Sequence, residues 1–223
     1  MRRRQGGKCN PGGAGNAPLP SFGPDNTHNV ESARQQEMRV VIVFILALCF
    51  LQLSSALQAG AEVFMTRDEA LKSVYPGAET IEKQRVYLSA ELKKEVEAKA
   101  KSKLTSSVHT FYVAKKNGHV LGYSILRTDT VRTHTETLLI TINPDGKLRQ
   151  IDILAFYEPS EYMASERWKH LFSGKTLSSS LRVGRDIPKM TGATLTSHAV
   201  TKAVRISLAL FEITCSNGLC KGV

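Results

Sequence analysis

The sequence is poor in the residues that most redox and metal sites require. Its 223 residues include only four cysteines, and no C-x-x-C or C-x-x-C-H pattern is present. Iron–sulfur clusters and attached haem depend on such spacings, so the sequence argues against both. Neither His134 nor His198 has a further ligand at the spacing of a metal site. The G-x-S-x-G signature of a nucleophilic serine is also missing.

The cysteines themselves are divided between the two ends of the chain. Cys9 and Cys49 fall in the first 61 residues, while Cys215 and Cys220 stand five positions apart near the end. The C-x4-C spacing around Asn217-Gly218 suits a small disulfide loop in an oxidising compartment. A redox-active dithiol is the alternative for this pair. The sequence favours a disulfide within a C-terminal tail at 214–223.

Long apolar runs are limited to one segment near the N-terminus. Residues 40–53 are almost unbroken apolar sequence, about 14 residues long, which is shorter than the about 20 that span a bilayer. Arg39 precedes this run, and Ala59-Gly60-Ala61 supplies an A-x-A cleavage site. The pattern therefore predicts a signal peptide over 38–61, with a signal anchor as the alternative. Either interpretation delivers the rest of the chain outside the cytoplasm, in the periplasm or on the outer face of the membrane.

The first 37 residues are rich in Gly, Pro, Asn and Arg and show no periodicity. Such a composition predicts disorder. Because Met38 stands where a signal peptide would begin, residues 1–37 are interpreted as a disordered leader or as the product of a misassigned start. With a signal anchor, the leader would instead be a cytoplasmic tail.

The formal net charge of +10 could indicate nucleic-acid binding, but the charge pattern does not support it. Lysines and glutamates alternate over residues 91–103, as on a solvated helix. The strands show no stripe of basic and aromatic residues. We expect no nucleic-acid partner, while a mildly basic surface could attract an acidic redox partner or anionic lipids.

Hydrophobic periodicity predicts an α+β domain with an antiparallel sheet of about four strands and flanking helices. Segment 62–104 is predicted to be helical, with helices beginning near Thr66 and spanning 89–101. Four strands follow within the main domain, 105–213, and Asn-Gly and Asp-Gly turns connect them in two hairpins. These strands are expected at 108–114, 120–126, 137–142 and 148–156.

A motif of small and hydroxyl residues is the strongest functional signal. It reads Met190-Thr191-Gly192-Ala193-Thr194-Leu195-Thr196-Ser197 and precedes an amphipathic run from His198 to Ile213. The N–H groups at a helix start attract phosphate, and Gly192 and Ala193 leave room for it. Thr196 or Ser197 could cap the helix or contact the phosphate. An anionic cofactor is therefore expected here.

The motif resembles the FMN-binding domain of flavin-carrying electron-transfer proteins. This domain occurs in the G subunit of Rnf-type complexes and in the C subunit of the sodium-translocating NADH:quinone reductase. The resemblance implies that a flavin transferase esterifies Thr194 to the phosphate of FMN. It also implies cofactor contacts from the neighbouring motif residues, Thr191, Gly192, Ala193, Leu195, Thr196 and Ser197. Lys189 departs from the family, which usually has an aspartate there.

Two strands and one loop extend the resemblance over residues 105–213. Gly118-His119-Val120-Leu121-Gly122-Tyr123 and Asp145-Gly146-Lys147-Leu148-Arg149-Gln150-Ile151 are similar to strands of the family. Glu158 matches the acid of a loop that packs beside the flavin. It could therefore accept a hydrogen bond from the isoalloxazine or from a nearby N–H, or it could simply cap a loop.

These patterns together predict an exported flavoprotein that carries electrons through FMN. No second redox motif is present in the sequence. The flavin would therefore exchange electrons with a redox partner protein or with a membrane oxidoreductase subunit. Membrane association is possible on this interpretation. The alternative is a secreted binding module without a cofactor, in which the Thr194 motif merely begins a helix.

Overall fold

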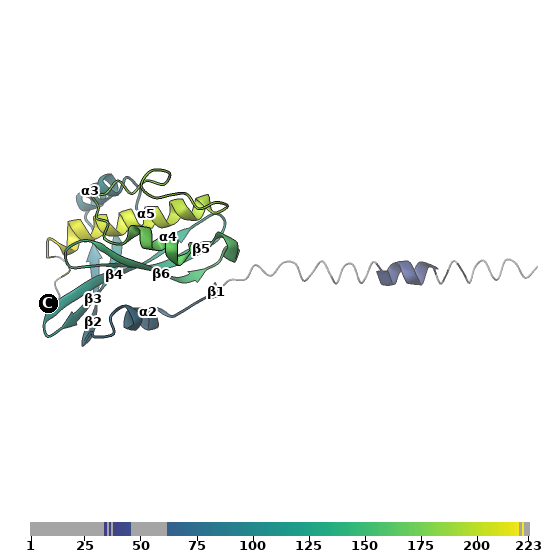
Figure 1. The fold of residues 1–223 in the computed structure, drawn as a ribbon, viewed down its shortest axis with the longest axis horizontal. Helices are drawn as coiled ribbons and strands as arrows, with labels where there is room; N and C mark the ends of the chain where they lie inside the picture. The colour runs from purple at the N-terminus through teal and green to yellow at the C-terminus, as the bar shows by residue number, and fades with distance from the viewer. Residues whose placement is uncertain (1–33, 35, 37, 46–61, 219, 221–223) are drawn as a thin grey trace, which may run out of the picture. The chain divides into compact units, whose positions relative to one another are not determined.

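The computed structural model describes residues 34, 36, 38–45, 62–218 and 220. Residues 62–218 contain a six-stranded sheet with helices on both faces, which confirms the predicted α+β class (Figure 1). The strand order is β1-β6-β5-β4-β3-β2, and every neighbouring pair is antiparallel. The strands are β1 Glu62–Val63, β2 Thr80–Tyr87, β3 Val108–Lys116, β4 His119–Thr130, β5 Thr135–Ile142 and β6 Leu148–Phe156.

The four predicted strands are confirmed as β3 to β6, which form a continuous meander. Asn117 and Gly118 both have left-handed backbone, with φ of 50° and 75°, and they join β3 to β4. Two consecutive positive φ angles match the twist of a hairpin, and Asn-Gly adopts them readily. Gly146, with φ of 80°, serves the second predicted turn between β5 and β6.

The predicted count of about four strands is too low, because the segment 62–104 contributes two more. β2 pairs with β3 along its whole length at one edge of the sheet, and β1 pairs with the end of β6. Val86 is the only fully buried residue of β2, so an apolar alternation is missing from its sequence. The two expected helices of this segment are confirmed as α2 Arg67–Val74 and α3 Ala90–Ala100.

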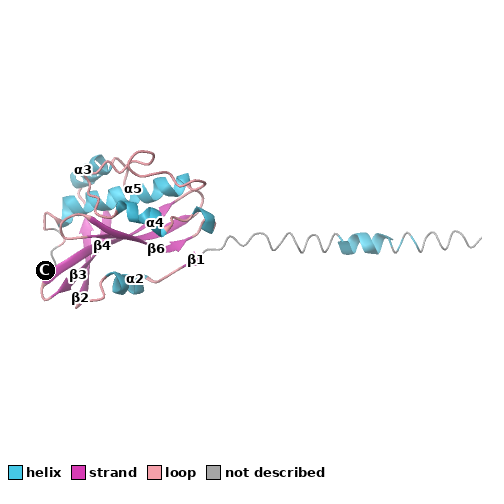
Figure 2. Cartoon of the chain, viewed as in Figure 1, coloured by secondary structure: helices cyan, strands magenta, loops and turns pink. Residues whose placement is uncertain are grey.

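Helices cover the sheet unequally (Figure 2). The long helix α5, Thr194–Leu210, continues into a π-helical turn at Phe211–Cys215 and packs against β4 and β5, with α3 beside it. The shorter helices on this side are α4 Glu166–Lys169 and the 3-10 turns η2 Ser160–Tyr162 and η3 His170–Phe172. Helix α2 packs on β5 and β6 from the opposite face.

Each face of the sheet has its own apolar core. The larger core lies under α5 and includes Phe111, Ile125, Leu138, Val200 and Val204. The smaller core lies under α2 and includes Leu71, Tyr112, Leu139 and Leu154. Because α5 is held along most of its length by the larger core, its first turn has a fixed position at one end of the sheet.

The structure tests the disulfide predicted near the C-terminus, but it describes only a small part of the predicted leader and signal segments. Cys215 and Cys220 form the predicted disulfide. Residues 38–45 are helical, whereas the leader at 1–37 and the remainder of the signal segment at 38–61 lie almost entirely outside the described residues. Within the described part of the chain, no helix combines the length and apolar character needed to cross a bilayer.

Candidate functional site

A pocket of about 230 Å³ opens at the first turn of α5. It brings together segments that are up to 65 positions apart in the sequence, from the β4–β5 loop, the segment after β6, the turn η2 and the Thr194 motif. The lining residues are Val131, Arg132, Glu158, Tyr162, Gly192, Ala193, Thr194, Leu195 and Thr196. Six of the eight residues predicted for the cofactor site therefore lie around one cavity.

Helix α5 begins at Thr194, four residues before the start expected from the sequence. Ala193 is the N-cap and provides no side-chain cap, whereas Thr66 and Ser89 cap α2 and α3. In the described part of the chain, no group accepts a hydrogen bond from the N–H of Thr194, Leu195 or Thr196. Three donors of the first turn are thus available to an anion in the pocket.

Gly192 shapes the turn that leads into this helix. Its φ is +80°, a left-handed conformation that other residues adopt at a cost. A Cβ at this position would meet no atom within 4 Å. The backbone conformation, and not only the space for a phosphate, therefore explains the glycine at this position.

Thr196 and Ser197 are buried, and their hydroxyls already have protein partners. Thr196 Oγ1 donates to the carbonyl of Tyr162 at 2.7 Å. Ser197 Oγ accepts from the N–H of Met190 at 3.0 Å and donates to the carbonyl of Ala193 at 3.1 Å. These bonds tie the motif to η2 and to its own preceding turn. Neither hydroxyl acts as the N-cap of α5.

Glu158 caps the β4–β5 loop, which forms another wall of the pocket. Its Oε1 accepts from the N–H groups of Arg132, Thr133 and His134 at 3.1, 2.7 and 2.8 Å. Glu158 as a whole residue is only 4% exposed. Burial disfavours the carboxylate, but the three N–H donors outweigh burial and hold the pKa of Glu158 below its usual value. The loop-capping role considered from the sequence is thus present in the structure.

The remaining walls are mainly apolar. Val131, Tyr162 and Leu195 line the pocket, and Leu195 is 51% exposed although it is large and apolar. Arg132 adds a cation on the same side as Glu158. Val131, Arg132 and Tyr162 were not among the residues predicted for the site. Their residue types are common in loops, and only the fold brings them to the Thr194 motif.

Two predicted residues lie outside the lining of the pocket. Thr191 is exposed just before Gly192, and Ser197 is buried behind the first turn of α5. The arrangement as a whole combines free N–H donors and a threonine hydroxyl with apolar side chains. Such a site suits an anionic group that is joined to a flat apolar ring system.

Comparison with known proteins agrees with this chemistry. Residues 133–209 match the model of a family described as "FMN-binding domain", a range that includes both Glu158 and the Thr194 motif. The chain is also similar to the G subunit of the Na(+)-translocating ferredoxin:NAD(+) oxidoreductase complex of Acetobacterium woodii. The two are 26% identical over 190 residues, which cover 77% of this chain and 87% of the relative.

Proposed function

We propose that this protein carries electrons through FMN attached to Thr194 by a phosphoester bond, and the match of residues 133–209 to the FMN-binding domain family supports FMN as the cofactor. The carrier would work outside the cytoplasm as a component of a membrane-associated redox complex. The observation that carries the proposal is the position of Thr194 at the uncapped start of α5, inside the pocket.

The pocket residues fit the two halves of FMN. The free N–H groups of the first turn of α5 would hold the phosphate, and Arg132 would add positive charge. Val131, Tyr162 and Leu195 would contact the apolar ring system. When bound, FMN supplies the capacity to accept and release electrons, while the protein supplies orientation and burial.

Thr194 is the residue best placed for the covalent bond. It is exposed, and its hydroxyl has no hydrogen-bond partner among the described residues, unlike the hydroxyls of Thr196 and Ser197. Forming the ester would break the Thr194 O–H bond and the phosphoanhydride bond of a flavin dinucleotide, and a nucleoside monophosphate and a proton would leave. A flavin transferase is therefore the expected maturation partner. Lys189 is exposed beside the motif, where such an enzyme would approach.

The relative supports the wider setting. Its name places it in a sodium-translocating ferredoxin:NAD(+) oxidoreductase complex. By analogy, we expect the present protein to exchange electrons with a redox partner or a membrane oxidoreductase subunit. A covalent tether suits this setting, because a cofactor that dissociates outside the cytoplasm would be lost.

The attachment is tested by intact-mass measurement of the protein co-expressed and exported with a flavin transferase. We expect a gain of one FMN less one water, together with flavin fluorescence that survives denaturation. Thr194→Ala should abolish both signals. Thr105→Ala is the matched control, because Thr105 is an exposed threonine that neither belongs to the motif nor lines the pocket.

Two results would count against the proposal. Covalent flavin retained by Thr194→Ala would mean that another residue carries it. A colourless, unmodified wild-type protein would favour the alternative of a secreted binding module, in which the first turn of α5 has only a structural role.

A further inference from the structure

A second concave surface lies along α5, beyond the pocket that contains Thr194. It is a groove of about 490 Å³ between α5, the end of α3 and the loop at 181–183. Its ionisable lining residues are Lys101, Arg182, His198, Lys202 and Arg205, and no acidic side chain lines it. We refer to these five residues and the cavity between them as the basic groove.

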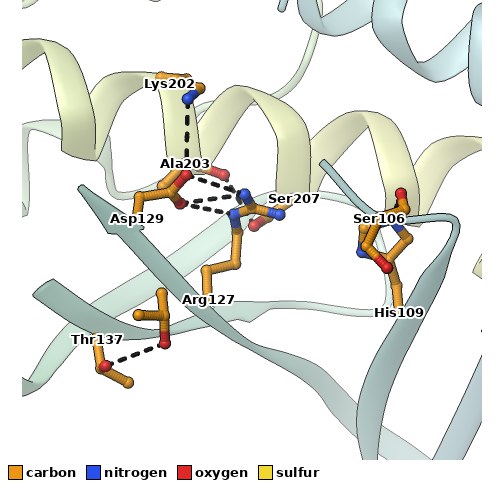
Figure 3. A network of polar contacts seen from close by, with 9 residues as sticks. Ser106, His109, Arg127, Asp129, Thr137, Lys202, Ala203 and Ser207 are labelled. Carbon is orange, nitrogen blue, oxygen red and sulfur yellow. Dashed lines mark hydrogen bonds and ion pairs between the residues drawn. The ribbon is translucent and has the colours of Figure 1, made fainter. Parts of the chain in front are cut away.

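The positive charges of the basic groove are poorly compensated. In the described part of the chain, Lys101, Arg182 and Arg205 form no ion pair, and Lys202 Nζ lies 3.7 Å from one oxygen of Asp129. Asp129 is already engaged by Arg127 through hydrogen bonds of 3.1 and 3.2 Å (Figure 3). Most of the charge of the groove is therefore free to act on a ligand.

Arg205 and its surroundings are held in place. Arg205 Nε donates to the carbonyl of Ala100 at 2.9 Å. Burial lowers the pKa of Arg205, and the positive charge of Arg182 lowers it further, while Asp186 opposes both. The carboxylate of Asp186 accepts from the N–H groups of Leu181 and Arg182 and so fixes the groove wall. The cations are thus crowded in a preformed concavity.

The basic groove is close to Thr194 because both belong to one face of α5. His198 follows Thr194 by four residues, Lys202 follows His198 by four, and Arg205 follows by three more. Residues at such spacings lie above one another on a helix. Electron transfer requires the partner to approach the flavin, and a partner seated in this groove would lie one helical turn from the attachment residue.

We propose that the basic groove docks an acidic surface of the protein that exchanges electrons with this one. The proposal rests on the electron-carrier function given above. Complementary charge would steer the encounter and orient the partner, as it does in many weak, short-lived complexes.

A protein partner fits the groove better than a membrane surface does. Helices and patches that bind lipid combine positive charge with exposed apolar side chains that enter the bilayer. Among the described residues, none of the large apolar side chains that are exposed lines the groove. Its concave form suits a projecting acidic loop of a folded partner.

The test neutralises two exposed cations of the groove, Arg182→Gln with Lys202→Gln, in the full flavin-bearing protein. The matched control is Lys83→Gln with Arg85→Gln, which removes the same charge from exposed residues of β2. Binding of an oligoglutamate peptide is followed by calorimetry at low salt. We expect the groove variant to bind about tenfold more weakly and the control to bind as the wild type does.

A second readout is electron transfer itself. Reduced ferredoxin serves as an acidic one-electron donor, each molecule delivering one electron to the flavin, and stopped-flow absorbance reports the rate. The second-order rate constant should fall about tenfold in the groove variant at low salt, and this difference should shrink as salt is added.

Several outcomes would overturn the proposal. Equal losses in the groove variant and the control would show that only net charge matters. Unchanged rates, combined with lost binding to phosphatidylserine vesicles, would assign the groove to a membrane. If the wild type carries no flavin but still binds oligoglutamate through the groove, the electron-carrier function fails, and the groove then binds acidic proteins that are not electron-transfer partners.

Discussion

At the scale of single residues, Glu136 is the most unusual of the buried side chains. It is completely buried in β5, and neither oxygen has a hydrogen-bond partner among the described residues. Asp129 is its direct neighbour across the sheet. Burial, and then the negative charge of Asp129, raise the pKa of Glu136 to about 8. The folded protein therefore holds Glu136 as a neutral acid at neutral pH.

This residue makes stability depend on pH. Below the ordinary pKa of 4.5, Glu136 is protonated in both the folded and the unfolded chain. Between there and about 8, the unfolded chain releases the proton while the folded one retains it, so the free energy of unfolding falls as pH rises. Above that range both forms are ionised, and the loss is constant. Its size is on the order of 5 kcal/mol, because the pKa rises from 4.5 to about 8 and each pKa unit corresponds to about 1.4 kcal/mol.

Glu136→Gln, a neutral replacement of similar shape, should remove this dependence. Urea unfolding measured at a series of pH values should show the stability of the variant, relative to the wild type, increasing as the solution becomes alkaline. Taking the difference between the two proteins cancels the other titrating groups. A difference that stays constant with pH would contradict the assigned protonation state.

At the scale of elements, the first turn of α5 depends on Ser197. Its hydroxyl is the contact that joins the helix to the N–H of Met190 across the Gly192 turn. Ser197→Ala would leave that N–H without its partner and should cost about 1–3 kcal/mol. Flavin attachment should become slower although Thr194 is intact, as measured by intact mass against time.

Ser207→Ala is the control for this experiment. Ser207 is also buried in α5, but among the residues that the structure describes its hydroxyl bonds only to the carbonyl of Ala203 within the helix. The variant should accept flavin at the wild-type rate. Similar slowing in both variants would indicate a general loss of stability instead of a specific effect on the Gly192 turn.

The sequence predicts those elements whose signal is local. The Asn117-Gly118 turn fixes one hairpin through backbone preference, and Thr66 with Glu69 forms a complete capping box. Strand β2 is not predictable in this way, because its stability comes from pairing with β3 and not from an apolar pattern. The start of α5 at Thr194 is also not predictable from the sequence. The hydroxyl residues Thr196 and Ser197 suggest an N-cap, but in the structure both already lie within the helix.

In the candidate site too, some residues are predictable from the sequence and others are not. Gly192, Thr194 and Glu158 are recognisable from a motif and a resemblance, and the structure places all three around one pocket. Val131 and Tyr162 have no such signal. They reach the site only because the β4–β5 loop and η2 are brought to the same end of the sheet by the fold.

At the scale of the whole molecule, the predicted cleavage site coincides with the start of the fold. Cleavage after Ala61 would leave Glu62 as the first residue, and Glu62 is also the first residue of β1. A chain that starts at Glu62 should keep the pairing with β6 and the bond from Phe64 N–H to the carbonyl of Leu154.

Two shortened chains test this arrangement. The one that begins at Glu62 should unfold at the temperature of the mature exported protein, whereas one that begins at Thr66 loses β1 and should melt lower, by roughly 2–4 °C per kcal/mol lost. N-terminal sequencing of the exported protein gives the true first residue. A first residue beyond Val63 would mean that β1 does not form after export.

The position of Thr194 at the start of the last helix has a consequence for quality control. The pocket is complete only when α5 has packed against a sheet whose strands all precede it in the chain. A truncated or misfolded chain would present Thr194 without the walls around it. On the proposed chemistry, the flavin would then mark molecules that have finished folding, and the yellow colour of a preparation would measure its native fraction.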